Sequence, residues 1–486
     1  MSAESLAALA PMVPVAAAAL AALLHRAPNL REAASLAAGA VLLACIGALV
    51  GPVLAGERPE FVLVEMLPGL DLAFRVEPFG LLFALIVAVL WLPSTLYSIG
   101  YLRANGEAKQ SRFFACFALA IASAIGVAFA GNLLTLFMFY EALTLVTWPL
   151  VTHHGDEEAR RGGRTYLALL IGTSTALFLP AIVATWVAAG TLDFTPGGIL
   201  RGRVSYGMGT FLLLLFAFGI GKAALMPLHR WLPAAMVAPA PVSALLHAVA
   251  VVKAGAFCVV KVVVYVFGAD GTVADFTPLV TVAAFTLVAA SVVALRADNL
   301  KRRLAYSTVS QLAYVVLAVA LLAPLSVAGA AMHVVAHAAG KITLFFAAGA
   351  VYTAAHKTKV SELDGAGRRM PWTFGAFAVA SLSMIGLPPA VGVASKWLIV
   401  AGAAQAENAL ALAALFAGTL LSAGYLLPVV YRAFLRAPAA GDSPHGEAPA
   451  TMVVALVATA TLTVALFFRH DVPLSLARGL LEGMRP

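Results

Sequence analysis

An apolar stretch of this sequence, from Phe211 to Lys261, contains ionisable side chains that could carry protons or ions. They include Lys222, His247, Lys253 and Lys261, and the same stretch contains Pro227, Pro233, Pro239 and Pro241. A charge near the centre of a bilayer costs from about 2.5 to more than about 10 kcal/mol, so a lysine inside a membrane span indicates a function. Prolines free backbone groups, which is tolerated where the helix is buried in protein or lines a wet cavity. The stretch therefore predicts a polar path inside a helical membrane protein.

Glu141 is the only acidic residue that the sequence places deep in a predicted span, within LLTLFMFYEALTLVTWPL. A carboxyl group without a partner in lipid takes up a proton, whereas a lysine partner keeps it ionised. We expect Lys222 to be that partner. Two interpretations stay open: a static ion pair that fixes helix packing, which is weak support for stability, or a switchable pair. In the second case Glu141 holds Lys222 protonated while the pair is closed, and the proton can leave when the pair opens.

The segment HVVAHAAGK places His333, His337 and Lys341 at successive i, i+4 positions on one face of a helix. Histidine titrates near neutral pH, so this spacing favours a proton relay. Histidines at this spacing can also bind a metal. No carboxylate or cysteine lies nearby in the span to complete such a site, and the sequence therefore predicts a relay and no metal.

Other polar groups in the spans have more than one explanation. His247 is either a relay residue or a hydrogen-bonded packing histidine. Lys261 lies closer to the outer end of its span, where we expect its side chain to extend to the interface, so it ranks below Lys253. Hydrogen bonds across helices would explain a polar group in the tenth span. Its members are Ser307, Thr308, Ser310, Gln311 and Tyr314.

Composition defines the class of protein that must position these residues. Of 486 residues, 62% are hydrophobic and 11% are charged, against about 25% charged in soluble domains. The net charge of +8 comes from residues in short loops between apolar runs and forms no basic patch for nucleic acid. The three cysteines, Cys45, Cys116 and Cys258, lie in apolar runs and are interpreted as core. We find no phosphate-binding loop, haem motif or iron–sulfur motif in the sequence, which predicts no cofactor and no enzymatic chemistry in the chain itself.

At about 20 apolar residues per crossing, the sequence predicts an all-α polytopic membrane protein with about fourteen transmembrane helices. The predicted spans are 7–24, 33–55, 79–99, 113–130, 132–152, 165–189, 207–228, 238–267, 278–295, 304–323, 326–354, 373–401, 408–431 and 450–468. Lysine and arginine gather in every second loop, so the positive-inside rule places those loops in the cytoplasm and both termini outside. We expect residues 56–78 to form an ordered hairpin or loop, and residues 437–449 to form a linker.

Two parts of the chain resemble one another. Lys222 precedes Pro227 in the seventh span, and Lys396 follows Pro388 and Pro389 in the twelfth span. Proline-interrupted helices at matching positions of two halves indicate inverted repeats around sites near the midplane. We therefore divide the chain into four parts. They are N-terminal helices (1–112), a first five-helix repeat (113–268), a second, inverted repeat (278–436), and a linker with the last helix (437–486).

Four motifs together resemble a known family. FMFYEALTL, the block GKAALMPLHRWLPAAMVAPAPVSALLHAVAVVKAG, HVVAHAAGK and SMIGLPPAVGVASKWL are similar to the antiporter-like subunits of complex I, membrane-bound hydrogenases and Mrp cation/proton antiporters. The resemblance covers roughly Asp71 to Arg436. It implies fourteen helices with two inverted five-helix repeats and broken seventh and twelfth helices. It also implies roles for single residues. Glu141 and Lys222 correspond to the ion pair of helices five and seven, and Lys253 to the eighth-helix lysine. Lys341 corresponds to the central lysine and Lys396 to the terminal residue, while the histidines of the hydrated axis correspond to His247, His333 and His337.

Within that family, the resemblance is greatest to D-type subunits of Mrp antiporters. SKWL, GAGRRMPWT and HGEAP carry this similarity, whereas M-type subunits of complex I have a glutamate at the position of Lys396. We expect neither the lateral helix of L-type subunits nor the extra C-terminal spans of A-type Mrp subunits. The implied function is proton translocation in a multisubunit antiporter for protons and a monovalent cation, with Na⁺ expected, alongside other membrane subunits in a bacterial cell membrane. The alternative is a proton-pumping subunit of complex I or of a hydrogenase, and a purely structural scaffold fits poorly with lysines inside spans.

Overall fold

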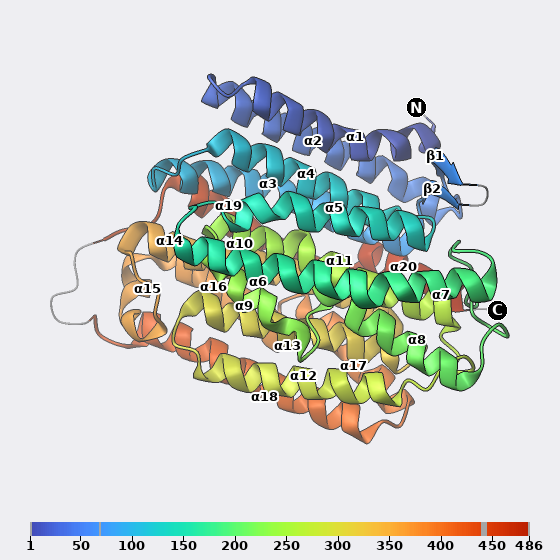
Figure 1. The fold of residues 1–486 in the computed structure, drawn as a ribbon. Helices are drawn as coiled ribbons and strands as arrows, with labels where there is room; N and C mark the ends of the chain where they lie inside the picture. Colours follow the sequence, from blue (N-terminus) through green and yellow to red (C-terminus); the bar gives the residue numbers. More distant parts are fainter. Residues whose placement is uncertain (1, 68–69, 439–444, 485–486) are drawn as a thin grey trace.

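The computed structural model describes residues 2–67, 70–438 and 445–484, and its helices run nearly parallel in one bundle (Figure 1). Twelve helical segments of the described chain are long and apolar enough to cross a membrane. They are α1 (Ala3–Leu23), α2 (Pro28–Leu54), α3 (Pro78–Ala104), α4 (Gln110–Ala128), α5 (Leu133–Val151), α6 to α7 (Glu157–Ala189), α10 to η6 (Ala240–Gly268), α12 (Thr277–Arg296), α13 (Leu300–Ala320), α14 (Pro324–Ala355), α18 (Ala409–Leu435) and α19 (Ala450–Phe468). Their apolar length matches the hydrocarbon core of a bilayer.

Two further crossings are interrupted in the middle. The seventh runs from α8 (Tyr206–Gly219) through η2 (Gly221–Ala223) and η3 (Leu228–Arg230) to α9 (Trp231–Ala234) and η4 (Ala235–Val237). The twelfth consists of α16 (Pro371–Ile385) and α17 (Gly392–Gln405). With the twelve continuous crossings these make fourteen, so the predicted span count and both broken helices are confirmed. The inverted relation of the two halves and the four-part division stay predictions.

The centre of the bundle is formed by the helices that carry the polar residues. The apolar windows of the 240–268 span and of α14 are entirely buried, and that of α13 is 94% buried. The 240–268 span is built from α10 (Ala240–Ala244), η5 (Leu245–Val249), α11 (Val251–Val262) and η6 (Val263–Gly268). By contrast, α2 and α19 bury only a third of theirs. The polar residues therefore lie where protein, and not lipid, surrounds them.

A β-hairpin covers one end of the bundle, beside both termini (Figure 1). Strands β1 (Glu60–Leu67) and β2 (Leu70–Arg75) pair antiparallel, as the predicted hairpin or loop allowed. Two backbone hydrogen bonds tie β2 to the loop between α4 and α5: Arg75 N donates to Phe129 O at 2.7 Å, and Gly131 N donates to Ala73 O at 2.9 Å. The short helix α15 (Ala366–Arg369) marks the opposite end.

Two segments near the C-terminus complete the fold. Of the predicted 437–449 linker, residues 439–444 lie outside the described residues, and residues 445–449 form no helix or strand. Beyond the last span, α20 (Asp471–Gly479) packs against α3 and α14, and η8 (Leu480–Met484) packs against α14 and η6. The sequence did not predict this pair of short helices. Their buried Leu476 and Leu480 return the chain to the bundle.

Candidate functional site

Seven of the eight predicted site residues are buried in the bundle. Lys222, His247, Lys253, His333, His337 and Lys341 are at most 1% exposed, Lys396 is 7% exposed, and Glu141 is partly buried. Because a buried polar group must find partners or lose free energy, the partners of these side chains decide what each can do.

Lys222 lies at the break of the seventh span and is held by α5. Its Nζ donates to Tyr140 O at 2.7 Å and to Thr144 Oγ1 at 2.6 Å, and its ammonium lies 3.2 Å from the centre of the Tyr140 ring. Its backbone N–H donates to the Tyr140 hydroxyl at 3.1 Å. Trp231 Nε1 donates to Gly221 O at 2.9 Å. The backbone N–H of Lys222 and the carbonyl of Gly221 thus have side-chain partners at the interruption of the helix.

The break also touches α11 at Gly255. A methyl group built on Gly255 would lie less than 3.0 Å from the carbonyl carbon of Lys222 and from the backbone nitrogen of Ala223. Those distances are far below van der Waals contact, so only glycine permits this approach. Gly255 follows Lys253 by two residues, and the backbone of Lys222 therefore lies against the helix that carries the next lysine.

The predicted contact between Glu141 and Lys222 is absent. The two residues form no ion pair within 4 Å, and Glu141 Oε1 is buried without a hydrogen-bond partner in the described structure. The cause is the geometry of α5: Tyr140 and Thr144 share one face at i, i+4 spacing, and Glu141 projects from a different face. The carboxylate stays within electrostatic range of the ammonium, but neutral oxygens satisfy the lysine.

Lys253 and His337, which lie on different spans, are in direct contact. Lys253 Nζ is hydrogen-bonded to His337 Nδ1. The ring of His337 stacks on that of His333 with centroids 6.1 Å apart. His337 Nε2 has no partner among the described residues. One nitrogen of His337 thus faces Lys253 while the other is free to exchange a proton.

His333 extends this contact toward two other spans. Its Nε2 is 3.0 Å from Gln311 Oε1, and its Nδ1 is 2.9 Å from Ser395 Oγ. Ser395 precedes Lys396 in the chain. The bond to Gln311 confirms the expected hydrogen bonding across helices, and Ser395 was missed by the sequence analysis.

A second branch leads from Lys341 back to Gln311. Lys341 Nζ donates to Ser307 Oγ at 2.6 Å, Ser307 Oγ donates to Tyr425 OH at 2.9 Å, and Tyr425 OH is 3.0 Å from Ser422 Oγ. Gln311 Nε2 completes the branch by donating to Ser422 Oγ at 3.5 Å. Lys341 and His333 are therefore joined by an unbroken series of hydrogen-bonding side chains.

The α18 members of this branch were not predicted. Ser422 and Tyr425 are three residues apart and share a face of α18, and both are buried. That spacing within an apolar span was the only sequence signal for them. It is weak, because serine and tyrosine in spans often hydrogen-bond only across helices.

Lys396 follows the break of the twelfth span and caps the end of α16. Its Nζ donates to Met384 O at 2.8 Å and to Ile385 O at 3.2 Å. The ammonium also lies 4.4 Å from the centre of the Tyr314 ring. A cation at the carbonyl end of a helix is favourable because the helix dipole is negative there. Lys396 therefore stabilises the break that it follows.

His247 is buried beside the network without joining it. Neither ring nitrogen has a hydrogen-bond partner in the described part of the chain, and its ring packs 4.5 Å from that of Phe345. Lys341, Lys301 and Lys253 lie within electrostatic range. A packing histidine would be hydrogen-bonded. His247 lacks those bonds, which leaves both nitrogens open to water or to a proton.

Lys261 does not reach the interface as we expected. It is 1% exposed and pairs with Glu77 at 3.1 Å, and it donates to Ala130 O at 2.6 Å. Its ammonium also lies 4.3 Å from the ring centre of Phe194. The prediction was wrong because Glu77, at the end of the predicted 56–78 hairpin or loop, is buried at the start of α3 and pairs with the lysine inside the bundle.

The described residues gather no three His, Cys, Asp or Glu side chains that could hold a metal ion.

Comparison of the sequence with known proteins shows which family the chain resembles. Residues 130–422 match the family model described as NADH:quinone oxidoreductase/Mrp antiporter, transmembrane. NADH-quinone oxidoreductase subunit N of Desulforudis audaxviator is 33% identical over 438 residues, which are 87% of each chain. The A/B component of a probable K⁺/H⁺ antiporter of Rhizobium meliloti is also 33% identical, over 77% of this chain but 38% of that protein.

Solved structures agree in fold. A chain of the Mrp complex from Dietzia sp. superposes with a TM-score of 0.88 at 20% identity, covering 99% of this chain and 97% of that one. A chain of the membrane-bound sulfane sulfur reductase, an archaeal respiratory membrane complex, superposes with a TM-score of 0.86 at 22% identity, covering 99% and 98%. The chain is therefore a multi-pass membrane protein that belongs to the NADH:quinone oxidoreductase/Mrp antiporter family.

Proposed function

We propose that this chain is the proton-translocating subunit of a multisubunit antiporter that exchanges protons for a monovalent cation, with Na⁺ as the expected cation. The observation that carries the proposal is the buried network in which Lys253 contacts His337, His337 stacks on His333, and side-chain hydrogen bonds lead on to Lys341. A scaffold does not need this series of ionisable groups inside spans, where each is costly.

In the proposed route, protons enter near Lys222 or His247 and pass through Lys253, His337 and Lys341. They leave by Lys396. The proton on Lys253 moves along its hydrogen bond to His337 Nδ1, and the free His337 Nε2 passes a proton onward. Each transfer is biased by the charge of the neighbouring groups, because His337 lies within electrostatic range of Lys253, Lys341 and His247.

The energies involved are of the right size. Two unit charges about 7 Å apart at an effective dielectric constant of about 20 repel by about 2.4 kcal/mol. One charge that crosses about 100 mV of membrane potential exchanges about 2.3 kcal/mol. The protonation of one lysine can therefore offset the membrane potential for a proton on the next.

We place the chain in a bacterial inner membrane with both termini outside. The support is that the termini and the β-hairpin share one end of the bundle (Figure 1), and that the arginine-rich and lysine-rich loops alternate with loops poor in these residues. The partners in this proposal are other membrane subunits, and the chain itself performs no covalent chemistry.

A second candidate function uses the same residues. The relative named subunit N of NADH-quinone oxidoreductase matches 87% of both chains, which favours a proton-pumping subunit of a redox complex of the complex I or hydrogenase type. In that case electron transfer in other subunits, and not a cation gradient, would drive proton movement through the lysines.

The composition of the native complex separates the two functions. The complex would be purified in mild detergent from its native membrane, and its subunits and absorption spectrum would be recorded. A colourless assembly of small hydrophobic subunits, with Na⁺-dependent or K⁺-dependent proton movement in vesicles, supports the antiporter. Iron–sulfur absorbance together with NADH, ferredoxin or hydrogen activity would reject it in favour of the redox pump.

A further inference from the structure

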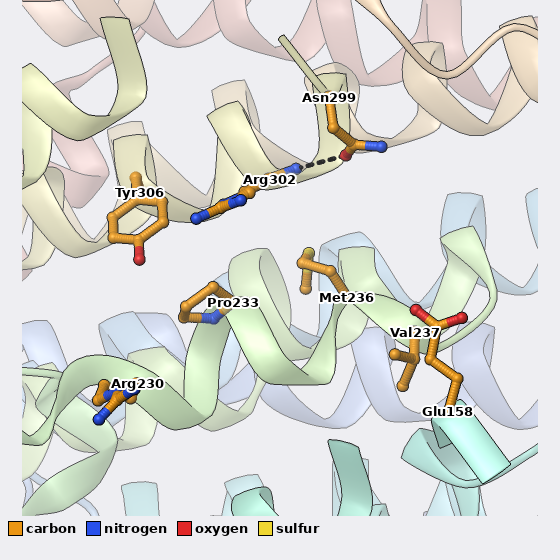
Figure 2. A pocket seen from close by; sticks show the side chains of 8 residues that line it. All are labelled: Glu158, Arg230, Pro233, Met236, Val237, Asn299, Arg302 and Tyr306. Atoms are coloured by element: carbon orange, nitrogen blue, oxygen red, sulfur yellow. Dashed lines mark hydrogen bonds between the residues drawn. The ribbon is translucent and has the colours of Figure 1, made fainter. Parts of the chain in front are cut away.

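A cavity of about 400 Å³ lies on a part of the molecule that the proton route does not use. It is bounded by the start of α6, by the second half of the seventh span (η3, α9 and η4), and by α13. Helix α9 contacts both α6 and α13. Figure 2 shows Arg302 and Tyr306 on one wall, with Arg230 and Pro233 on the facing wall.

The free polar groups of this cavity are mostly hydrogen-bond donors. Arg230 and Arg302 are exposed, and neither guanidinium makes an ion pair or a side-chain hydrogen bond with any described residue. Tyr306 OH and the side-chain amide NH₂ of Asn299 donate to none either, because Asn299 contributes only its oxygen, to Arg302 N at 3.0 Å (Figure 2). Two guanidiniums, a hydroxyl and an amide form a donor set that suits an oxyanion, above all phosphate.

The rest of the wall is apolar. Pro233, Met236 and Val237 lie on the same wall as Arg230 and face Arg302 across the cavity. A small hydrated anion does not need this surface, whereas the glycerol and first methylenes of a lipid would pack on it. The site is thus amphiphilic, with cationic and apolar parts side by side.

The depth of the cavity fits a lipid headgroup. α13 has 21 residues, which is about 31 Å and close to the hydrocarbon thickness of a bilayer. Tyr306 lies six residues after Leu300, or about 9 Å along the helix from its start. His229, next to Arg230, packs on Tyr306 with ring centroids 5.9 Å apart. Arg302, in the first turn of α13, therefore lies near the boundary between headgroups and hydrocarbon. Arg230 lies deeper, beside the level of Tyr306, and long basic side chains at such positions extend toward phosphate.

From this arrangement we propose that the cavity binds the phosphate of an anionic phospholipid, with Arg302 on one wall and Arg230 on the facing wall as the two basic residues that attract it. Basic pockets between transmembrane helices are a general mode of recognition of anionic headgroups. Glu158 lies apart from Arg230 in the same cavity (Figure 2). Its carboxylate would repel a phosphate from that part of the cavity.

The test measures lipid binding and not transport, so it can fail while the proposed function holds. The purified complex in nanodiscs is titrated with phosphatidylglycerol and with phosphatidylcholine, and in detergent with inorganic phosphate. Bound lipid is counted by native mass spectrometry. Arg230→Gln with Arg302→Gln should weaken phosphatidylglycerol binding about twenty-five-fold, since each arginine at an anionic lipid surface contributes about fivefold.

A matched control replaces two arginines near the start of α6, the helix that carries Glu158. Arg160 and Arg161 are exposed and line no part of this cavity, so Arg160→Gln with Arg161→Gln has the same change in net charge. The proposal requires this control to keep its bound phosphatidylglycerol, and Glu158→Gln to bind it more tightly. Both double variants should elute as folded complexes in size-exclusion chromatography.

Three results would overturn the proposal. The first is an equal loss of lipid from both double variants, which would indicate a general charge effect. The second is equal binding of phosphatidylcholine, or saturation by inorganic phosphate with no preference for lipid. The third is a structure of the assembled complex in which an acidic segment of a neighbouring protein, and no lipid, contacts Arg230 and Arg302.

Discussion

The two broken spans each carry a lysine, but they hold it in different ways. Lys222 in the seventh span donates to Tyr140 and Thr144 of a different helix, α5. Lys396 in the twelfth span donates to Met384 and Ile385, carbonyl oxygens of its own span. Neither forms an ion pair with a carboxylate in the described structure. A shift of α5 relative to the seventh span would change the ligands of Lys222, whereas Lys396 keeps its ligands as long as its own span stays intact.

Because of this difference, we expect substitutions of the two lysines to have different effects on transport and stability. A residue whose ligands belong to a neighbouring helix can gain or lose them when helices move, which suits a step that must switch. A residue that caps its own helix contributes to stability in every state. We therefore expect changes at Lys222 to affect transport most, and changes at Lys396 to affect stability as well.

The largest effect is expected for Lys222→Ala. Loss of a positioned proton carrier costs about a hundredfold or more in rate, so proton movement in vesicles should fall to background while the protein stays assembled in the membrane. Lys109→Ala, an exposed loop lysine, is the control and should transport normally. Disappearance of the Lys222→Ala protein from the membrane would instead identify the residue as a structural one, which would contradict the comparison.

The Lys253 and His337 contact predicts strong non-additivity. If the proton passes directly between them, Lys253→Ala and His337→Ala should each reduce transport strongly, and the double variant should be hardly worse than either single one. Residues in direct contact show coupling energies of about 0.5 to 3 kcal/mol. A double-mutant cycle on initial transport rates measures this coupling, and simple additivity would show that the two side chains act in separate steps.

Lys396→Ala should lower stability and transport together. The loss of a cation at the end of α16 should reduce the free energy of unfolding by about 1 kcal/mol, visible as a lower thermal midpoint in detergent. Lys396→Arg keeps a donor near the same carbonyl oxygens and should restore most of the stability. If Lys396→Ala has the thermal midpoint of the unmodified protein, the capping role assigned to this lysine is wrong.

Thr144→Val tests the ligands of Lys222 with a smaller change. The variant removes one hydrogen-bond acceptor but keeps the shape and the Tyr140 carbonyl, so we expect a loss of about 1 kcal/mol and a reduction of transport by severalfold. Thr147→Val is matched to it, because Thr147 bonds Tyr166 and not the lysine. Equal transport by both variants would mean that Thr144 does not help to hold Lys222.

The smallest effect on stability and transport is expected for Glu107 and His154, in the loops that follow α3 and α5. The hydrogen bond to Glu107 raises the pKa of His154. Burial tends to raise the pKa of Glu107, but the hydrogen bond from His154 and the charges of both neighbouring histidines outweigh it and lower that pKa below its usual value. The pair therefore stabilises the fold above the ordinary pKa of glutamate and below that of histidine.

Glu107→Gln should consequently cost about 0.5 kcal/mol, and most between about pH 4.3 and pH 6.5. The benefit from His154 is lost as the pH rises through its folded pKa, and that from Glu107 is lost as the pH falls through its own. Thermal midpoints at acidic, intermediate and alkaline pH measure this. Transport should stay unchanged, and a transport defect as large as that of Thr144→Val would show that this pair contributes to transport as well as to stability.

The spans and breaks were predictable because they depend on local properties. Apolar length, loop charge and proline position are visible in the sequence, and a bilayer permits few alternatives to helices. The face shared by His333, His337 and Lys341 was predictable for the same reason, since helical spacing alone defines it.

The contacts between spans were less predictable because they depend on rotation about each helix axis. Glu141 and Tyr140 are adjacent in sequence, yet only Tyr140 contacts Lys222. Glu77 lies far from Lys261 in sequence, and only the packing of α3 against α11, where Phe79 stacks on Phe257 with centroids 4.7 Å apart, brings them together. A single sequence does not reveal how α5 or α3 is rotated about its axis.

The approach of Gly255 to the carbonyl of Lys222 has a mechanical consequence. The backbone of one lysine rests against the helix of another, with only a hydrogen atom between them, so this point cannot be compressed. If the broken span tilts, it must pivot there, and the two ends on either side of the contact must move in opposite directions. The side chain of Lys222 could then change partners while its distance from the α11 axis stays fixed. Gly255 would thus be the pivot point between the segments that carry Lys222 and Lys253.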